Sequence, residues 1–132
     1  LAEFSGSTVT ALNSAMFQFS VSGGGFLLIP PGLYSLASAE LSTPILIPSN
    51  VFLECAGAQF TITGSSYIGS VFRSVNASNI IIRNLQVFGN SMAVADGSSG
   101  AFYNFVQDTS GTGCENIELD NIRLQNFAAE LD

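Results

Sequence analysis

Three charged residues occupy equivalent positions of a repeated phrase and could together perform acid and base chemistry. The phrase runs from Asn into a β-rich stretch and occurs at residues 49–54, 78–83 and 115–120, where its last position holds Glu54, Arg83 and Asp120. A carboxylic acid and a carboxylate on opposite sides of a sugar linkage are the groups that hydrolyse glycosides. We therefore consider Glu54 and Asp120 as an acid and base, with Arg83 orienting them or neutralising a uronate.

The spacing of these groups is compatible with two interpretations. If the phrases stack as parallel coils about 4.8 Å apart, Glu54 and Asp120 lie about 9.6 Å apart, near the upper limit for an inverting glycosidase. Glu118 and Asp120, on the same side of one strand, are about 7 Å apart and form a second candidate pair. The alternative is an ion-pair ladder in which Arg83 separates two carboxylates, with each exposed pair worth under about 1 kcal/mol.

The repetition of the phrase predicts the fold that would position these groups. Its Asn residues, at positions 50, 79 and 116, are 29 and 37 residues apart. Repeats of this length indicate a solenoid, in which each coil covers the apolar face of its neighbour. Alternation sends two aliphatic columns inward: Val51, Ile80 and Ile117, and Leu53, Ile82 and Leu119. The next inward position holds Cys55, Asn84 and Asn121, and we expect the Asn side chains to form an amide ladder.

The rest of the chain fits an all-β solenoid with one helix. Apolar residues at helical spacing predict an amphipathic helix over 7–20, with Ser7 or Thr8 as its N-cap, ended by the glycines at 23–25. Short strands are predicted at 26–29, 33–36, 45–47, 51–55, 59–63, 70–73, 80–83, 85–88, 102–106, 117–120 and 122–124. We expect one domain over 1–132, with about four coils between residues 26 and 127.

Composition excludes several classes of function. The formal net charge is −7, with three arginines, no lysine and no histidine among 132 residues, so no basic patch is available for nucleic acid. No apolar run approaches the roughly 18 residues of a membrane span. Charged residues make up only 10% of the chain, which favours an extracellular or virion surface location. The two cysteines lie at different phases of the coil, so we expect separate thiols.

Two further acidic residues could bind a metal. Asp96 and Asp108 flank a loop and offer the oxygen ligands that Ca²⁺ prefers. The Asp-Gly pair at 96–97 is far more often typical of a turn than of a metal site. We keep Ca²⁺ as a candidate ligand at Asp96 and Asp108, with no other cofactor indicated.

Two segments of the chain resemble the beginning of the pectate-lyase-like superfamily of right-handed parallel β-helices. The first, residues 24–34, resembles the family segment GG-x-(V/L)-x-(I/V/L)-PPG-x-Y, and the second, residues 47–57, resembles IPSNV-x-LEG-x-G with Cys55 in place of Gly. The resemblance extends over about residues 7–127 and implies that the helix caps the first coil. The polygalacturonase-like signatures, including Gly-His-Gly and Arg-Ile-Lys, are missing from this sequence.

Members of this superfamily include polysaccharide lyases, glycoside hydrolases, epimerases, phage tailspikes and adhesins. The resemblance therefore implies a protein that contacts a polysaccharide and cleaves it as a lyase or hydrolase. The alternative is a non-enzymatic structural or adhesive β-helix, such as a tailspike shaft or filament subunit, that self-assembles through open solenoid ends. No terminal cap is recognisable at the C-terminal end, so we expect either part of a longer chain or a subunit of an assembly.

Overall fold

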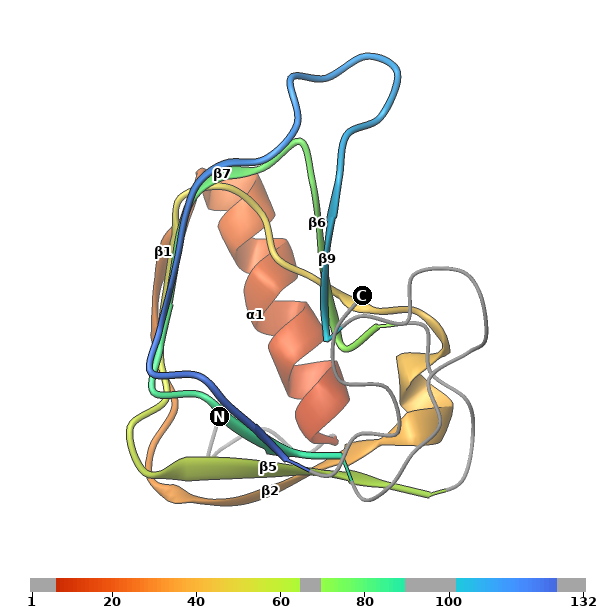
Figure 1. Cartoon of the computed structure of the whole chain (residues 1–132), viewed down its shortest axis with the longest axis vertical. Helices are drawn as coiled ribbons and strands as arrows, with labels where there is room; N and C mark the ends of the chain where they lie inside the picture. Colours follow the sequence, from red (N-terminus) through yellow and green to blue (C-terminus); the bar gives the residue numbers. More distant parts are fainter. Residues whose placement is uncertain (1–6, 65–69, 90–101, 126–132) are drawn as a thin grey trace.

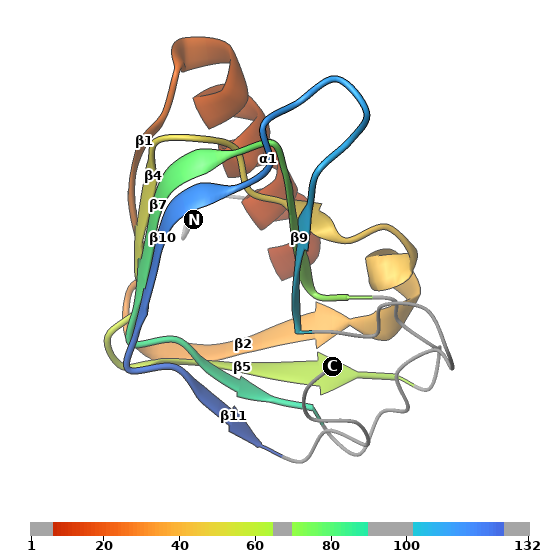
Figure 2. The same ribbon diagram turned by 45° about the horizontal axis from the view of Figure 1, so that its top comes forward.

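The computed structural model describes residues 7–64, 70–89 and 102–125, which wind as a right-handed parallel β-helix. Successive strands join three sheets in turn, so that sheets A, B and C form the sides of a triangular cross-section (Figures 1 and 2). Sheet A contains β1 (Gly25–Leu28), β4 (Val51–Glu54), β7 (Ser78–Arg83) and β10 (Glu115–Asp120). Sheet B contains β2 (Gly32–Ala37), β5 (Ala58–Thr63), β8 (Gln86–Phe88) and β11 (Arg123–Gln125), and sheet C contains β3 (Ile45–Leu46), β6 (Phe72–Val75) and β9 (Tyr103–Val106).

The pairing of the sheet A strands confirms the predicted solenoid register. Val51 pairs with Ile80 and Ile80 with Ile117, while Leu53, Ile82 and Leu119 form the second column, all between parallel strands. The first two members of each column are no more than 1% exposed. Leu119, on the last described coil, is 43% exposed. Among the described residues, these two columns are therefore buried in the second and third coils, and Leu119 in the fourth coil is partly exposed.

Asparagine forms the corners between sheets. Asn50, Asn79 and Asn116 enter sheet A, and Asn84 and Asn121 lie between sheets A and B; all five have φ between 54° and 63°. This left-handed conformation costs most L-residues free energy, but Asn tolerates it well. On the first coil the equivalent of Asn50 is Gly24, where a Cβ would lie 2.3 Å from the Asn50 carbonyl oxygen. The recurring Asn is thus a backbone requirement of the corner.

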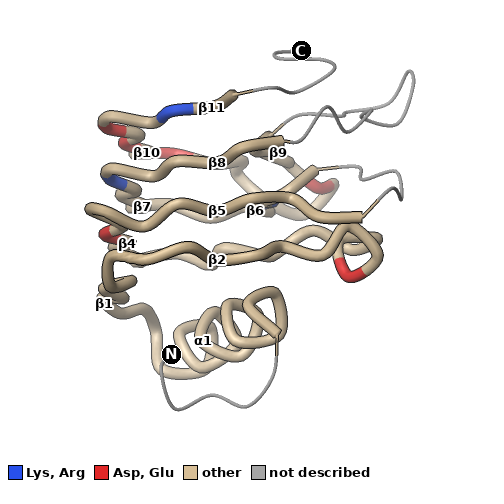
Figure 3. Tube along the Cα trace, turned by 90° about the horizontal axis from the view of Figure 1, so that it is seen from below, with Lys and Arg blue, Asp and Glu red and all other residues tan. Residues whose placement is uncertain are grey.

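Helix α1 (Thr8–Ser22) covers one end of the solenoid, below the first coil in Figure 3. Ser7 is its N-cap and accepts a hydrogen bond from the Thr10 N–H at 3.1 Å, and Gly23 ends it at φ 91°. Its inward side chains Val9, Leu12 and Met16 are buried, as predicted from their spacing. The helix runs two residues further than predicted, because Gly23 is the first residue that stops it. No helix in the described ranges is long and apolar enough to span a membrane.

Two local predictions were wrong. The strand expected at 70–73 is β6 at Phe72–Val75, because Phe72 takes the inward position between Ile45 of β3 and Tyr103 of β9. A short 3₁₀ segment, η1 (Ser38–Ser42), was not predicted. With Phe72 inward, alternation places Arg73 on the outer face of sheet C.

Candidate functional site

The predicted acidic residues lie together on the outer face of sheet A. Glu54 pairs in register with Arg83 and Arg83 with Asp120, while Glu118 lies beside Ile81 one column away. Figure 3 shows these charges along the corner where β4, β7 and β10 stack. The sequence therefore predicted correctly which of these residues share a face.

The interactions of this group differ from the predicted ladder on one side. Arg83 Nη2 lies 3.4 Å from Glu118 Oε1 and Arg83 Nε lies 3.6 Å from Asp120 Oδ2, so both of its carboxylate partners belong to the following coil. Glu54 instead accepts hydrogen bonds from Asn84 Nδ2 at 3.1 and 3.2 Å, one to each oxygen. The Arg83 guanidinium also lies 5.2 Å from the centre of the Phe52 ring.

This arrangement favours the ion-pair interpretation of the sheet A charges. The side chains of Arg83, Glu118 and Asp120 are 39%, 51% and 59% exposed, so solvent screens their attraction. The Arg83 guanidinium forms ion pairs with Glu118 and Asp120 of the fourth coil, and the Asn84 amide donates hydrogen bonds to Glu54. The assignment of Glu54, Asp120, Arg83 and Glu118 to acid and base catalysis stays a prediction.

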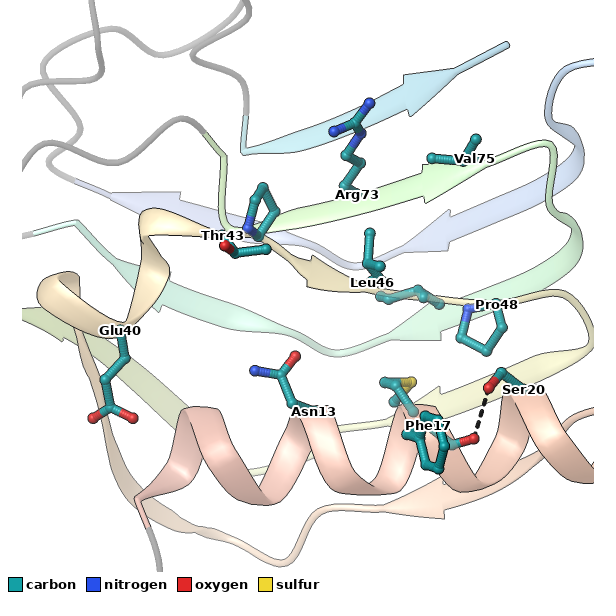
Figure 4. Close-up of a pocket in the computed structure, with 12 residues that line it drawn as sticks. Asn13, Phe17, Ser20, Glu40, Thr43, Leu46, Pro48, Arg73 and Val75 are labelled. Atoms are coloured by element: carbon teal, nitrogen blue, oxygen red, sulfur yellow. Dashed lines mark hydrogen bonds between the residues drawn. The ribbon is translucent and has the colours of Figure 1, made fainter. Parts of the chain in front are cut away.

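A groove of about 570 Å³ lies on a different side of the molecule, between α1 and the outer face of sheet C. Figure 4 shows Asn13, Phe17 and Ser20 of α1 along one side and Leu46, Arg73 and Val75 of β3 and β6 along the other. Phe17, Leu46 and Val75 are 64%, 53% and 37% exposed, so the walls are apolar and open to solvent. Side chains of this kind suit the apolar faces of a ligand with polar edges.

Arg73 is the distinctive residue of this groove. Its Nε, like that of Arg83, is enclosed by protein and has no hydrogen-bond partner among the described residues. Both ion pairs found in the described ranges belong to Arg83, so neither Arg73 nor Arg123 has an ion-pair partner among the described residues, and of these two Arg73 lines the groove. Because Arg73 lines the open groove, its guanidinium could pair with a carboxylate or other anion bound there.

Glu40 is the other charged residue lining the groove, and it has a structural partner. Its Oε2 accepts hydrogen bonds from Ser7 Oγ at 2.5 Å and Thr10 Oγ1 at 3.4 Å, at the N-terminal end of α1. These contacts use Glu40 to hold the helix. The described groove therefore offers anion binding through Arg73, without a second carboxylate for acid and base chemistry.

Sequence reasoning did not single out Arg73 because it lies outside the repeated phrase from which the charged columns were predicted. Three arginines in an acidic chain were a usable signal, since only Arg83 falls between carboxylates in the repeated phrase. The groove itself depends on how α1 packs beside sheet C, and no local pattern in the sequence predicts that packing.

Of the two candidate calcium ligands, the structure describes only Asp108. Asp108 closes a turn, where its Oδ1 accepts from Ser110 N at 3.0 Å and Ser110 Oγ at 2.9 Å. Hydrogen bonds from the Asn76 side chain and from Ser110 hold the pKa of Asp108 below its usual range. Asp96 lies outside the described residues. Within the described ranges no three Asp, Glu, Cys or His residues cluster closely enough to hold a metal, and calcium binding stays a prediction.

Comparison with known proteins finds similarity in structure. Neither a protein-family model nor a curated protein sequence matches the chain significantly. The A-module of mannuronan C-5 epimerase AlgE4 from Azotobacter vinelandii superimposes with a TM-score of 0.75 at 19% identity, over 96% of this chain and 37% of the module. The AlgE6 A-module from the same organism gives 0.71 at 22% identity, over 90% and 34%. A protein from Parabacteroides merdae described as a candidate glycosyl hydrolase gives 0.53 at 15% identity, over 94% and 70%.

These similarities concern the fold. The chain spans about a third of the length of the two epimerase modules, and identities of 15–22% establish shared architecture alone. The predicted parallel β-helix fold is confirmed, because the described strands form parallel sheets with the helix at one end.

Proposed function

From the premise that this chain has the right-handed parallel β-helix fold of the pectate-lyase-like superfamily, we propose that it binds an acidic polysaccharide in the groove between α1 and sheet C. Arg73 pairs with a sugar carboxylate, and Phe17, Leu46 and Val75 contact the apolar faces of neighbouring sugar rings. The observation that carries the proposal is the position of Arg73 in the lining of an open groove, with no ion-pair partner among the described residues.

Chemical and structural arguments support a uronate as the ligand. Arginine binds carboxylates through two parallel N–H groups, which suits a planar carboxylate on a sugar ring. Two of the similar structures are named as mannuronan epimerases, which makes polymannuronate the first ligand to test. A location outside cells or on a virion belongs to the same proposal. Cleavage by a lyase or hydrolase mechanism would use Glu54 and Asp120 on the outer face of sheet A, away from this groove, and is tested separately below.

The test is a calorimetric titration with mannuronate oligomers, using neutral mannose oligomers as the ligand control. Arg73→Gln is expected to weaken mannuronate binding at least about tenfold, the effect of losing one charge-assisted contact. Arg123→Gln removes an exposed arginine on β11 and is the matched control, expected to bind as the parent does. If Arg73→Gln binds mannuronate as tightly as the parent, the groove is not the site.

A second arm separates the groove from the sheet A face. Arg83→Gln releases Glu118 and Asp120, and a loss of binding confined to this variant would move the site to sheet A. Assays for reducing ends and for unsaturated products, run on Glu54→Gln and Asp120→Asn, test the catalytic assignment. Product formation by the parent that survives in both variants would remove these two carboxylates from the mechanism.

A further inference from the structure

The groove between α1 and sheet C holds a single positive charge. The chain contains three arginines and no lysine or histidine, and two of the arginines lie elsewhere, Arg83 in β7 of sheet A and Arg123 in β11 of sheet B. Arg73 is therefore the only basic side chain among the described residues that line the groove, in a protein with a formal net charge of −7. A ligand with several carboxylates could place only one of them against a cation.

One end of the groove carries a negative charge. Figure 4 shows Glu40 near the N-terminal end of α1, with Arg73 further along the groove. The described hydrogen-bond partners of Glu40 are the hydroxyls of Ser7 and Thr10, which are neutral and leave its charge in place. The positive end of the α1 dipole offsets about half a unit of that charge. A second carboxylate on this side of Arg73 would therefore be repelled.

The groove continues past its cation into a second hollow of about 280 Å³ at the C-terminal end of α1. The hollow adjoins the groove, because both are lined by Ser20, Pro48 and Val75. The last turn of α1 contains no basic residue, so its carbonyl groups give this end a partial negative charge of about half a unit. Ser49 and Asn50 add neutral polar groups, which suit sugar hydroxyls.

We propose that the groove selects a polysaccharide in which single uronates are flanked by neutral sugars, in preference to a polyuronate. This inference rests on the proposed binding of a uronate by Arg73 and adds which sugars can lie on either side of it. In a polyuronate, the neighbouring carboxylates would lie toward Glu40 and toward the C-terminal end of α1. Both ends repel anions, and repulsion between two unit charges about 7 Å apart in water corresponds to about a threefold loss of affinity.

Two β-1,4-linked trisaccharides test this selection, one with mannuronate between two mannoses and one with three mannuronates. In calorimetric titration at about 20 mM salt, the single-uronate ligand is expected to bind the parent at least about threefold more tightly than trimannuronate. At about 200 mM salt the two affinities should approach each other, because screening shortens the reach of the charges. Trimannuronate that binds at least as tightly as the single-uronate ligand at low salt would overturn the inference.

Glu40→Gln tests the repulsion at its own end of the groove. The substitution is expected to tighten trimannuronate binding about threefold at low salt and to change binding of the single-uronate ligand less. Glu115→Gln removes the same charge from β10 and is the matched control, expected to bind trimannuronate as the parent does. Equal gains from the two substitutions would overturn the inference, because the repulsion would then come from the net charge. If Glu40→Gln weakens both ligands by disturbing α1, the salt comparison on the parent decides.

Arg73→Gln separates this inference from the proposed function. If the single-uronate ligand binds Arg73→Gln as tightly as it binds the parent, the proposed site fails and this inference fails with it. Absence of binding of both ligands to the parent has the same consequence. If Arg73→Gln weakens both ligands but the parent does not distinguish them, Arg73 binds a uronate and only the selection between ligands is wrong.

Discussion

Cys55 shows how the interior of the solenoid acts on a single side chain. It is fully buried and unpaired with Cys114, as expected from their different phases. Burial, with a smaller effect from the charge of Glu54, raises the pKa of the Cys55 thiol from 9.0 to about 12. The thiol is therefore protonated and unreactive in the folded chain, and its role is to fill the core.

This raised pKa predicts a loss of stability in alkali. The folded state holds the Cys55 proton more tightly than the unfolded state, so the contribution is complete below about pH 9 and is lost as pH rises toward about 12. Between pH 8 and pH 10 the free energy of unfolding should fall by about 1 kcal/mol because of this residue. Urea unfolding of Cys55→Ala should show a correspondingly smaller fall, with Cys114→Ala as control. Identical pH dependence in the parent and Cys55→Ala would contradict the burial argument.

At the scale of elements, the position of α1 depends on a contact between distant segments. The helix has no acidic residue in its first turn. Glu40 of η1, 33 residues from Ser7, supplies a negative charge there through its contacts with Ser7 and Thr10. The unpredicted η1 segment thus fixes the end of α1 beside sheet C, where the helix forms one wall of the groove.

Glu40→Gln is expected to lower the free energy of unfolding by about 1 kcal/mol, because it removes the charge next to the helix N-terminus. Chemical denaturation measures this loss. Glu115→Gln changes an exposed carboxylate on β10 and is the matched control, expected to unfold as the parent does. A Glu40→Gln variant as stable as the parent would show that the contact does not hold the helix.

At the scale of the whole molecule, stability is distributed along the solenoid axis. Each coil is covered by its neighbours, so equivalent residues in one column differ in burial only because of their position along the axis. Leu53 is 1% exposed in the second coil, whereas Leu119 of the same column is 43% exposed in the fourth.

The same substitution should therefore cost different amounts at these two positions. Leu53→Ala is expected to lower the free energy of unfolding by about 3 kcal/mol through lost burial and a cavity, and Leu119→Ala by about 1 kcal/mol. Urea unfolding of the two variants gives the comparison directly. Similar losses would mean that the end beyond β10 is covered in solution.

Much of this architecture was predictable from local patterns. The Asn near the start of each phrase marks the corner between sheets. The alternation after it predicts which side chains point inward, so the sequence predicted the register of β4, β7 and β10. The partners within the sheet A face were less predictable. Asn84 and Arg83 could both reach the Glu54 carboxylate. In the structure Asn84 donates hydrogen bonds to Glu54, whereas Arg83 forms ion pairs with Glu118 and Asp120 of the next coil.

The sequence by itself determined the winding of this protein, because corner residues and inward side chains act within a few positions and repeat once per coil. Only the tertiary structure decided where a ligand could bind. The groove brings α1 beside β3 and β6, more than 20 and more than 45 residues further along the chain, and so places Arg73 opposite the helix. Contacts of this kind depend on packing between elements, which the local sequence pattern does not encode.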